Sequence, residues 1–283
     1  MTKGAPLASA SVMEPVTGSA LAARIAEQAQ WYHSMELLPG VVTPGWFDTR
    51  PLVAALPIPT SLEGKRCLDV GTFDGFWAFE MERRGAAEVV AVDVLDPKGW
   101  DWPVASTPDA VATIGERKAK GEGFDLAKTA LGSAVTRREV SVYDLDPGDV
   151  GAFDFVYMGS LLLHLQNPVR ALERVHTVCR GTLLAVDAVD STLSRIFRSR
   201  PVATLDAVGR PWWWKPNVAG LQRMVEAAGF TVIETPRRVR IRRGAGRTAP
   251  PLTPRTLRHR AGREAVASHW LGDAHAAVLA RPT

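Results

Sequence analysis

One stretch of the sequence combines glycines and carboxylates in a pattern suited to a charged ligand. From Cys67 an apolar segment ends at Asp69, and a turn containing Gly71 leads to Gly75, the expected start of a helix. Glycines at such a turn let the backbone approach a ligand closely. Dinucleotide-binding turns use G-x-G-x-x-G to seat a pyrophosphate on a helix N-terminus, but this stretch is D-x-G-x-x-x-G with a further acid at Asp74. The negative charge favours a ligand with an ammonium group, and the glycine spacing argues against a dehydrogenase.

Another carboxylate closes the apolar segment that follows. Asp93 ends the run 89–93 and lies 22 residues after Gly71. In nucleotide-binding α/β folds, an acid at about this distance accepts the hydroxyls of a ribose. Asp69 and Asp93 together therefore indicate a ligand that joins a nucleoside to an ammonium group. A turn that served only to pack a helix on a strand would leave both acids without a role.

These acids need a scaffold that brings strand ends together, and the pattern of short apolar runs supplies one. Continuous apolar runs such as 89–92 indicate strands buried on both faces, and their alternation with helical segments predicts a parallel sheet covered by helices on both faces. We expect strands at 67–70, 89–93, 139–142, 153–158, 183–187, 230–234 and 276–279, and helices at 21–30, 75–84, 108–131 (interrupted), 168–179 and 217–228.

The order of these residues resembles the class I S-adenosyl-L-methionine (SAM) methyltransferases, whose first motif is an acid two positions before a glycine turn. The resemblance implies a Rossmann-like α/β fold with a seven-stranded, mostly parallel sheet and a reversed final hairpin. It implies SAM as the cofactor and S-adenosyl-L-homocysteine (SAH) as the product. It also implies cofactor contacts along the turn and at the following strand ends, namely Asp69, Gly71, Thr72, Phe73, Gly75, Asp93, Val94, Val142, Tyr143, Asp144, Met158 and Gly159.

The same resemblance implies a role for each part of the ligand. Asp69 and Gly71 would line the methionine end, and Asp93 would hold the ribose. Val142 and Tyr143 would flank the adenine with Asp144 near its amino group, and 158–159 would lie under the ligand.

A narrower resemblance covers the chain from about residue 31 through 230 and resumes at the last strand. The segments 31–34 (WYHS), 43–46 (TPGW) and 158–164 (MGSLLLH) are similar to relatives of the carboxy-SAM-dependent enzyme that modifies wobble uridine in tRNA. That enzyme binds the extra carboxylate with a lysine, a tyrosine and an arginine. This chain has no basic segment upstream of Trp46, has Leu163 before His164, and has His275-Ala276 before the last strand. An unpaired buried carboxylate is costly, so SAM is the expected cofactor.

Two histidines are candidate catalytic residues. His164 follows the fourth strand at the carboxyl edge of the sheet, where it either acts as a general base or caps the turn before Pro168. His33 either touches the acceptor or cofactor, or packs in the N-terminal segment. Trp46 matches a cofactor-contacting tryptophan of the tRNA enzyme, and Trp212–Trp214 form either a lid over a flat acceptor or a hydrophobic clamp.

Length and composition set the organisation we expect. The chain has 283 residues, 46% hydrophobic and 23% charged, which is ordinary for a globular protein. We expect a disordered tail at 1–20, a helical and loop cap at 21–60, a SAM-binding core at 61–190, and at 191–283 the rest of the same domain with a Trp-rich lid, a basic loop and closing strands. Two isolated cysteines, no secretion signal and no membrane-length apolar run predict a cytoplasmic protein without a disulfide framework, and no metal-ligand spacing appears.

The charge distribution leaves more than one function open. Ten arginines and no acid lie between Arg237 and Arg263, on a chain whose net charge is +4. The tract is either a phosphate-binding stripe or a solvated loop that balances an acidic body. The main hypothesis is a SAM-dependent methyltransferase acting on oxygen or nitrogen of a small aromatic molecule. The alternatives are tRNA methylation and a non-catalytic SAM-binding module.

Overall fold

The structure is a computed structural model that describes residues 18–28, 30–118, 121–208 and 212–283. Residues 1–17, which hold most of the expected tail, lie outside the described residues. The first helix, α1 (Gly18–Glu27), begins three residues before the predicted start at Leu21.

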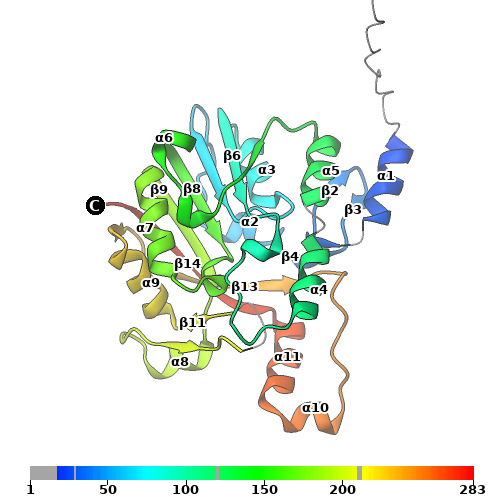
Figure 1. Cartoon of the computed structure of the whole chain (residues 1–283), viewed down its shortest axis with the longest axis vertical. Helices are drawn as coiled ribbons and strands as arrows, with labels where there is room; N and C mark the ends of the chain where they lie inside the picture. Colours follow the sequence, from blue (N-terminus) through cyan, green and yellow to red (C-terminus); the bar gives the residue numbers. More distant parts are fainter. Residues whose placement is uncertain (1–17, 29, 119–120, 209–211) are drawn as a thin grey trace, which may run out of the picture.

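A large mixed sheet with helices on both faces forms the body of the protein (Figure 1). The seven predicted strands are all present, in the order β7-β6-β5-β8-β9-β14 with β12 paired to β14. The first five are parallel, whereas β14 runs antiparallel to both β9 and β12. The fold class is therefore confirmed, including the reversed final hairpin. These strands are β5 (Arg66–Val70), β6 (Glu88–Asp93), β7 (Thr136–Glu139), β8 (Phe153–Gly159), β9 (Cys179–Ala188), β12 (Phe230–Val232) and β14 (Asp273–Pro282).

Each face of the sheet carries its own hydrophobic core. On one face, side chains of β5 and β8 pack with α1, α2 (Leu52–Ala55), α3 (Phe76–Arg83) and α5 (Glu122–Leu131). On the other, they pack with α6 (Pro147–Val150), α7 (Pro168–Val178) and α9 (Val218–Ala227). Helix α7 shows how sequence sets this arrangement, because Asn167 caps it and Ala171, Leu172, Val175 and Val178 give it one buried stripe.

The third strand lies three residues earlier than predicted. The sequence indicated 139–142, but β7 is Thr136–Glu139, and 142–144 form the 3₁₀ turn η3 (Val142–Asp144), capped by the Ser141 side chain. Strand β7 is the sheet edge and is mostly polar, so it lacks the apolar run that marks the central strands. The other 3₁₀ turns are η1 (Pro97–Gly99) and η4 (Leu162–His164), and helix α4 (Pro108–Lys118) follows η1.

The sheet continues beyond the seven expected strands. Strand β13 (Arg237–Arg243) pairs antiparallel with β14 and with β4 (Gly45–Asp48), and β4 pairs parallel with β1 (Trp31–His33). The expectation of a solvated loop is therefore wrong for 237–243. Val239 and Ile241 alternate with arginines and pack against the core, but their charged neighbours hide this two-residue period in the sequence.

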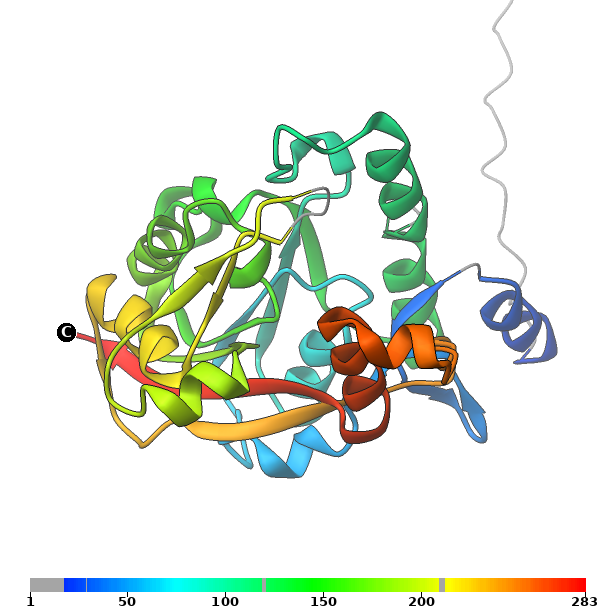
Figure 2. The same cartoon turned by 90° about the horizontal axis from the view of Figure 1, so that it is seen from below.

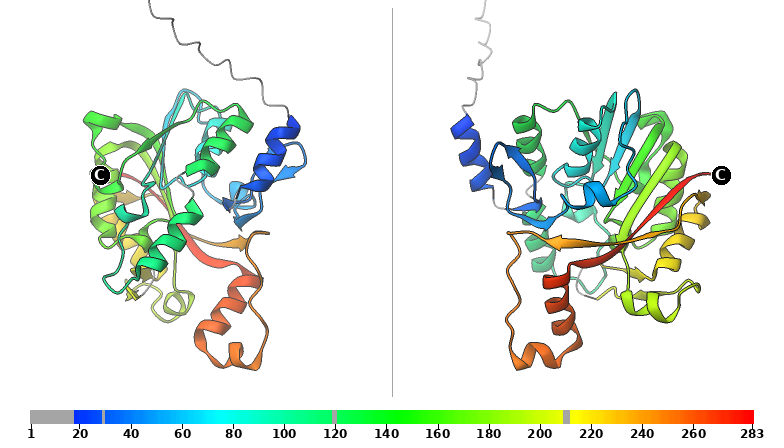
Figure 3. Two further views of the ribbon diagram at one scale, coloured as in Figure 1. Left: turned by 45° about the vertical axis from the view of Figure 1, so that its right-hand side comes forward. Right: turned by 180° about the vertical axis from the view of Figure 1, so that it is seen from behind.

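The remaining segments lie around the rim of the sheet. Figure 2 shows the body from below, with β13 and β14 running across it toward α11, and Figure 3 shows an arm that projects from the body at that end. The arm and the small elements are α10 (Pro254–Arg258), α11 (Arg260–Leu271), α8 (Ser191–Ile196), β2 (Glu36–Leu38) with β3 (Val41–Val42), and β10 (Ala203–Leu205) with β11 (Trp214–Pro216).

Candidate active site

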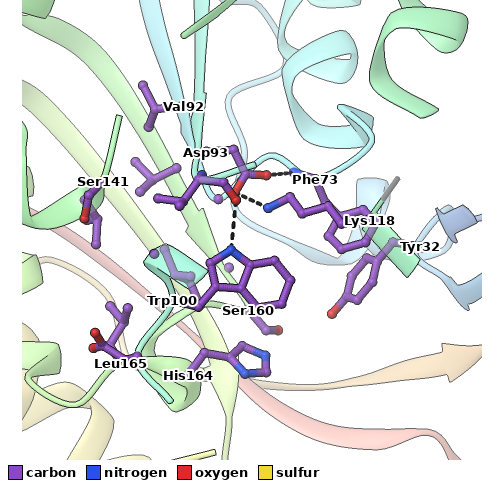
Figure 4. A pocket seen from close by; sticks show the side chains of 18 of the residues that line it. Tyr32, Phe73, Val92, Asp93, Trp100, Lys118, Ser141, Ser160, His164 and Leu165 are labelled. Carbon is purple, nitrogen blue, oxygen red and sulfur yellow. Dashed lines mark hydrogen bonds and ion pairs between the residues drawn. The ribbon is translucent and has the colours of Figure 1, made fainter. Parts of the chain in front are cut away.

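A cavity of about 360 Å³ lies at the carboxyl ends of the central strands. Gly71 follows β5, Asp93 ends β6 and Gly159 ends β8, and all three line it. Figure 4 shows Tyr32, Asp93, Trp100 and His164, from four separate segments, gathered around one space. This is the edge of an open α/β sheet at which ligands bind, and the volume is in the range of small-molecule pockets.

Asp93 is held rigidly at the wall of this cavity. Its Oδ2 accepts a hydrogen bond from the Phe73 backbone N–H at 2.8 Å, and its Oδ1 accepts one from the Val94 N–H at 2.8 Å. Lys118 Nζ forms an ion pair with Oδ1 and lies over the rings of Phe73 and Trp100, 5.3 and 5.1 Å from their centroids (Figure 4). A carboxylate has about four acceptor positions, two on each oxygen. One position on Oδ2 is therefore left for a ligand, whereas Val94 and Lys118 take both positions on Oδ1.

Asp69 lies beneath the glycine turn and does not line the cavity. Its Oδ2 accepts hydrogen bonds from Thr72 Oγ1 at 2.7 Å and from the Ala78 N–H at 3.2 Å. Burial raises the pKa of Asp69 from 3.8 to about 7, although the Thr72 hydrogen bond opposes the shift. Asp69 therefore ties the turn to α3, where Gly75 is the N-cap with φ +91°.

Asp74 also faces the protein and not the cavity. Its Oδ2 accepts the backbone N–H groups of Tyr32 and His33, each at 2.8 Å, and its Oδ1 pairs with His33 Nδ1. The sequence suggested that acids beside the turn favour an ammonium ligand. The structure corrects this for Asp74, which instead fastens β1 to the turn between β5 and α3.

The loop after β8 is held by an acid that the sequence analysis did not single out. Asp187, in β9, is fully buried, and its Oδ2 accepts the N–H groups of Leu161 and Leu162 at 2.8 and 2.7 Å. Burial raises the pKa of Asp187 to about 6. The carboxylate fixes the turn that carries His164 to the cavity.

Another part of the cavity lining is apolar except for a tyrosine. Val94, Val142 and Tyr143 line it, and Tyr143 Oη donates a hydrogen bond to Asp101 Oδ2 at 2.6 Å. Burial and this carboxylate raise the pKa of Tyr143 above its ordinary value. Asp144 points to the exposed side of η3 and is not among the lining residues.

The tryptophans divide between the cavity and its support. Trp46, Trp100 and Trp212 line the cavity. The Trp213 and Trp214 indole N–H groups donate to the backbone oxygens of Asp101 and Gln166 at 2.7 and 3.0 Å. Trp212 thus faces the cavity and the other two indoles are hydrogen-bonded to loop carbonyls, and a lid over an acceptor stays a prediction.

Ten of the fifteen predicted site residues line this one cavity. They are His33, Trp46, Gly71, Phe73, Asp93, Val94, Val142, Tyr143, Gly159 and His164. Asp69, Thr72, Gly75, Asp144 and Met158 do not, and Met158 is completely buried in the core.

Several lining residues carried no signal that sequence reasoning used. Lys118 ends a helix whose pattern shows only amphipathicity, and Ser160 and Leu165 flank residues that were singled out. Tyr32 stands in the WYHS segment and could have been chosen with His33. Among the described lining residues there is one lysine and no arginine.

The arginines of the basic tract bond largely within the protein. Arg240 donates to the Gly272 carbonyl at 3.0 Å, Arg243 to Ser268 Oγ at 2.9 Å, and Arg247 pairs with Asp273 at 3.3 Å and lies over Phe47. The tract thus joins β13 to its neighbours, and a phosphate-binding role stays a prediction.

Two features of other protein classes are not found among the described residues. In these residues no three histidine, cysteine or acidic side chains gather as a metal site would require. None of the helices described here has the length and apolar character of a membrane span.

Comparison with known proteins relates this geometry to a family. A family model described as a methyltransferase domain matches residues 48–235, more than half of the chain. No protein of curated function matches.

Solved structures share the fold. The N-terminal domain of EvdMO1, crystallised in the presence of SAH and D-fucose, is similar with a TM-score of 0.55 and 15% sequence identity, over 94% of this chain and 97% of that domain. The longer EvdMO1 structure is similar with a TM-score of 0.53 and 16% identity, over 94% of this chain and 48% of that one. From the family match and the shared fold, the chain belongs to the methyltransferase-domain family and is a SAM-dependent methyltransferase.

Proposed function

We propose that this enzyme transfers the methyl group of SAM to an oxygen or nitrogen atom of a small aromatic molecule, with both ligands in the cavity at the ends of β5, β6 and β8. One observation carries the proposal. The carboxylate of Asp93 and a wall of tryptophan, tyrosine and histidine side chains face the same space of about 360 Å³.

The cavity suits the adenosine part of SAM. Asp93 offers acceptor positions for ribose hydroxyls, and the apolar side chains of Val94, Val142 and Leu165 offer surfaces for a flat base. A diol needs two such positions, so the ribose would take the place of the Lys118 ammonium on Asp93 Oδ1. The donor and acceptor groups of the site therefore fit the cofactor.

The methionine part would extend along the glycine turn. Gly71 lines the cavity with φ +78°, and a Cβ there would come within 3.1 Å of Leu161. Glycine at position 71 leaves backbone open to a ligand that approaches closely, whereas Gly159 lets β8 pack against the Val186 carbonyl of β9.

The chemistry of the step sets what the protein residues must do. SAM supplies a methyl group that is already activated by its sulfonium. The side chains of this enzyme must hold the acceptor atom in line with that methyl, exclude water and accept a proton where the acceptor has one to lose. His33 and His164 both line the cavity and are the candidate bases.

The acceptor class follows from the lining. Trp46, Trp100, Trp212 and Tyr32 present large rings with few polar groups, and such walls favour a flat, largely apolar molecule.

Calorimetric titration with SAM tests the cofactor half of the proposal. We expect Asp93→Ala to weaken SAM binding about 10- to 100-fold, because hydrogen bonds to a buried charged group are each worth about 1.5–3 kcal/mol. Asp149→Ala, on exposed helix α6 away from the cavity lining, is the matched control and should bind like the wild type. Equal affinity of wild type and Asp93→Ala would refute the site.

Turnover tests the acceptor half. SAH formation, followed by mass spectrometry, is compared for a panel of small phenols and anilines and for total tRNA. We expect SAH with members of the small-molecule panel. SAH formed only with tRNA would establish the tRNA alternative, and SAM binding without turnover on either would favour a non-catalytic module.

A further inference from the structure

One buried histidine–carboxylate pair lies at the cavity wall. His33 lines the cavity and is 4% exposed, and Asp74, which does not line it, is 2% exposed. The imidazole Nδ1 of His33 pairs with Asp74 Oδ1. A carboxylate behind a histidine that faces a reaction site calls for a functional explanation.

Both partners are fixed by their surroundings. Asp74 is anchored because its Oδ2 accepts the N–H groups of Tyr32 and His33 at 2.8 Å each. The His33 ring stacks on Phe76, with centroids 5.3 Å apart, and meets Tyr32 edge-on at 4.8 Å. The ring therefore has one orientation relative to the carboxylate and the cavity.

This arrangement determines which ring nitrogen carries the proton. A neutral imidazole has one donor and one acceptor nitrogen, and an ionised carboxylate only accepts. With Nδ1–H donated to Asp74, Nε2 is left as the basic nitrogen. The same carboxylate stabilises the imidazolium that forms when Nε2 takes a proton.

The charged and titratable groups around His33 come from three elements. They are Asp74 in the loop before α3, Asp69 in β5 and Tyr32 in β1. Asp74 is the group bonded to the imidazole Nδ1.

We propose that His33 is the general base of the methyl transfer, that Asp74 is the positioning residue that sets its tautomer, and that the acceptor atom is a hydroxyl oxygen. This rests on the methyl transfer proposed above. The acceptor O–H proton passes to His33 Nε2 while the oxygen forms a bond to the methyl carbon. The carbon–sulfur bond breaks, its electron pair stays on sulfur in neutral SAH, and the imidazolium then returns its proton to water.

The acceptor class follows from the need for such a base. A neutral amine attacks with its own lone pair and can lose its proton afterwards. A hydroxyl is a weak nucleophile until its proton leaves, so a positioned base is of most use to a hydroxyl acceptor. The base is assigned to His33 because its Nδ1 contacts the buried Asp74 carboxylate, and His164 also lines the cavity.

The variant Asp74→Asn separates positioning from structure. An asparagine carbonyl can still accept both backbone N–H groups, while its NH₂ donates to His33 Nδ1 and forces the proton onto Nε2. We expect kcat with hydroxyl acceptors to fall about 10²- to 10⁴-fold, as for loss of a general base, and SAM affinity to stay within about twofold. His33→Gln should lose as much, and the double variant no more than either.

Nuclear magnetic resonance of ¹⁵N-histidine reads the tautomer without any acceptor. We expect His33 to carry its proton on Nδ1 in the wild type and on Nε2 in Asp74→Asn. His176, in α7 and packed on Phe230, is the control. Its signals should be the same in the wild type and in Asp74→Asn, and the variant His176→Gln should be as active as the wild type.

Each contrary result has a distinct meaning. A wild-type His33 protonated on Nε2, undiminished kcat in Asp74→Asn, or turnover confined to anilines would overturn the proposal. A tenfold loss of SAM affinity in His33→Gln would make His33 a cofactor ligand and would overturn it too. Failure of the wild type to bind SAM at all would instead refute the proposed function.

Discussion

Buried carboxylates support the site one residue at a time. Asp69 holds the turn, Asp74 holds β1, Asp93 faces the cavity and Asp187 holds the loop of His164. Of these four, only Asp93 lines the cavity. The other three use backbone and hydroxyl donors to fix segments that do, and burial keeps two of them, Asp69 and Asp187, harder to ionise than ordinary acids.

The raised pKa of Asp69 predicts how stability depends on pH. Its pKa is about 7 in the folded protein, against 3.8 for an ordinary aspartate. Below pH about 4 the group is protonated in both states and costs nothing. As pH rises from about 4 to 7 the unfolded chain releases the proton first, so the free energy of unfolding falls, by a few kcal/mol in total.

Asp69→Asn isolates this contribution. Urea denaturation between pH 4 and 8 gives the free energy of unfolding of both proteins. We expect that of the wild type to fall relative to the variant up to about pH 7, and the difference between the two to stay constant above this pH. A difference that does not vary with pH would mean that Asp69 is ionised in the folded protein throughout.

At the scale of elements, the turn between β5 and α3 depends on one glycine. Gly75 has φ +91°, and a Cβ there would overlap the buried ring of Phe79. A residue other than glycine pays about 1–2 kcal/mol for the left-handed backbone, and overpacking adds about 1–3 kcal/mol.

Comparison of Gly75→Ala with Gly85→Ala separates the two costs. Gly85 has φ +87°, but its Cβ would meet nothing closer than 3.9 Å. We expect thermal unfolding to show a larger loss for Gly75→Ala, together with weaker SAM binding. Equal losses in the two variants would show that Phe79 yields to the methyl group without cost.

The elements that sequence could predict are those with an apolar signal. The central strand β6 contains a continuous apolar run, and α7 has an asparagine cap and a regular stripe. Strand β13 was missed because arginines surround Val239 and Ile241, and β7 was misplaced because an edge strand need not be apolar.

Asp93 and Gly71 were found because their roles depend on local position along the chain. Lys118 and Asp187 could not be found, because only the tertiary fold brings them to the site.

Over the whole molecule, the N-terminal cap and the C-terminal tract complete the sheet around the cavity. β1 and β4 carry His33 and Trp46 to the cavity, and β4 is joined to the rest of the sheet through β13. The arginines of β13 are thus part of the structure that holds the cap in place.

Gly45→Ala tests this dependence. Gly45 is in register with Trp31, and a Cβ there would overlap the backbone of His33. We expect hydrogen exchange to become faster in β1 and β4 while β5 and β8 stay protected, and SAM affinity to fall. Gly18→Ala, at the start of α1 with open space around it, is the control. Unchanged exchange in β1 would show that the cap does not need the close approach at Gly45.

A crystal structure of the complex with SAH decides most directly whether the nucleoside is held where we propose. We expect both ribose hydroxyls on the carboxylate of Asp93, Lys118 moved from its ion pair, and the base against Val94 and Val142. Density for SAH elsewhere, or an intact Lys118–Asp93 pair beside an occupied site, would contradict the proposed binding mode.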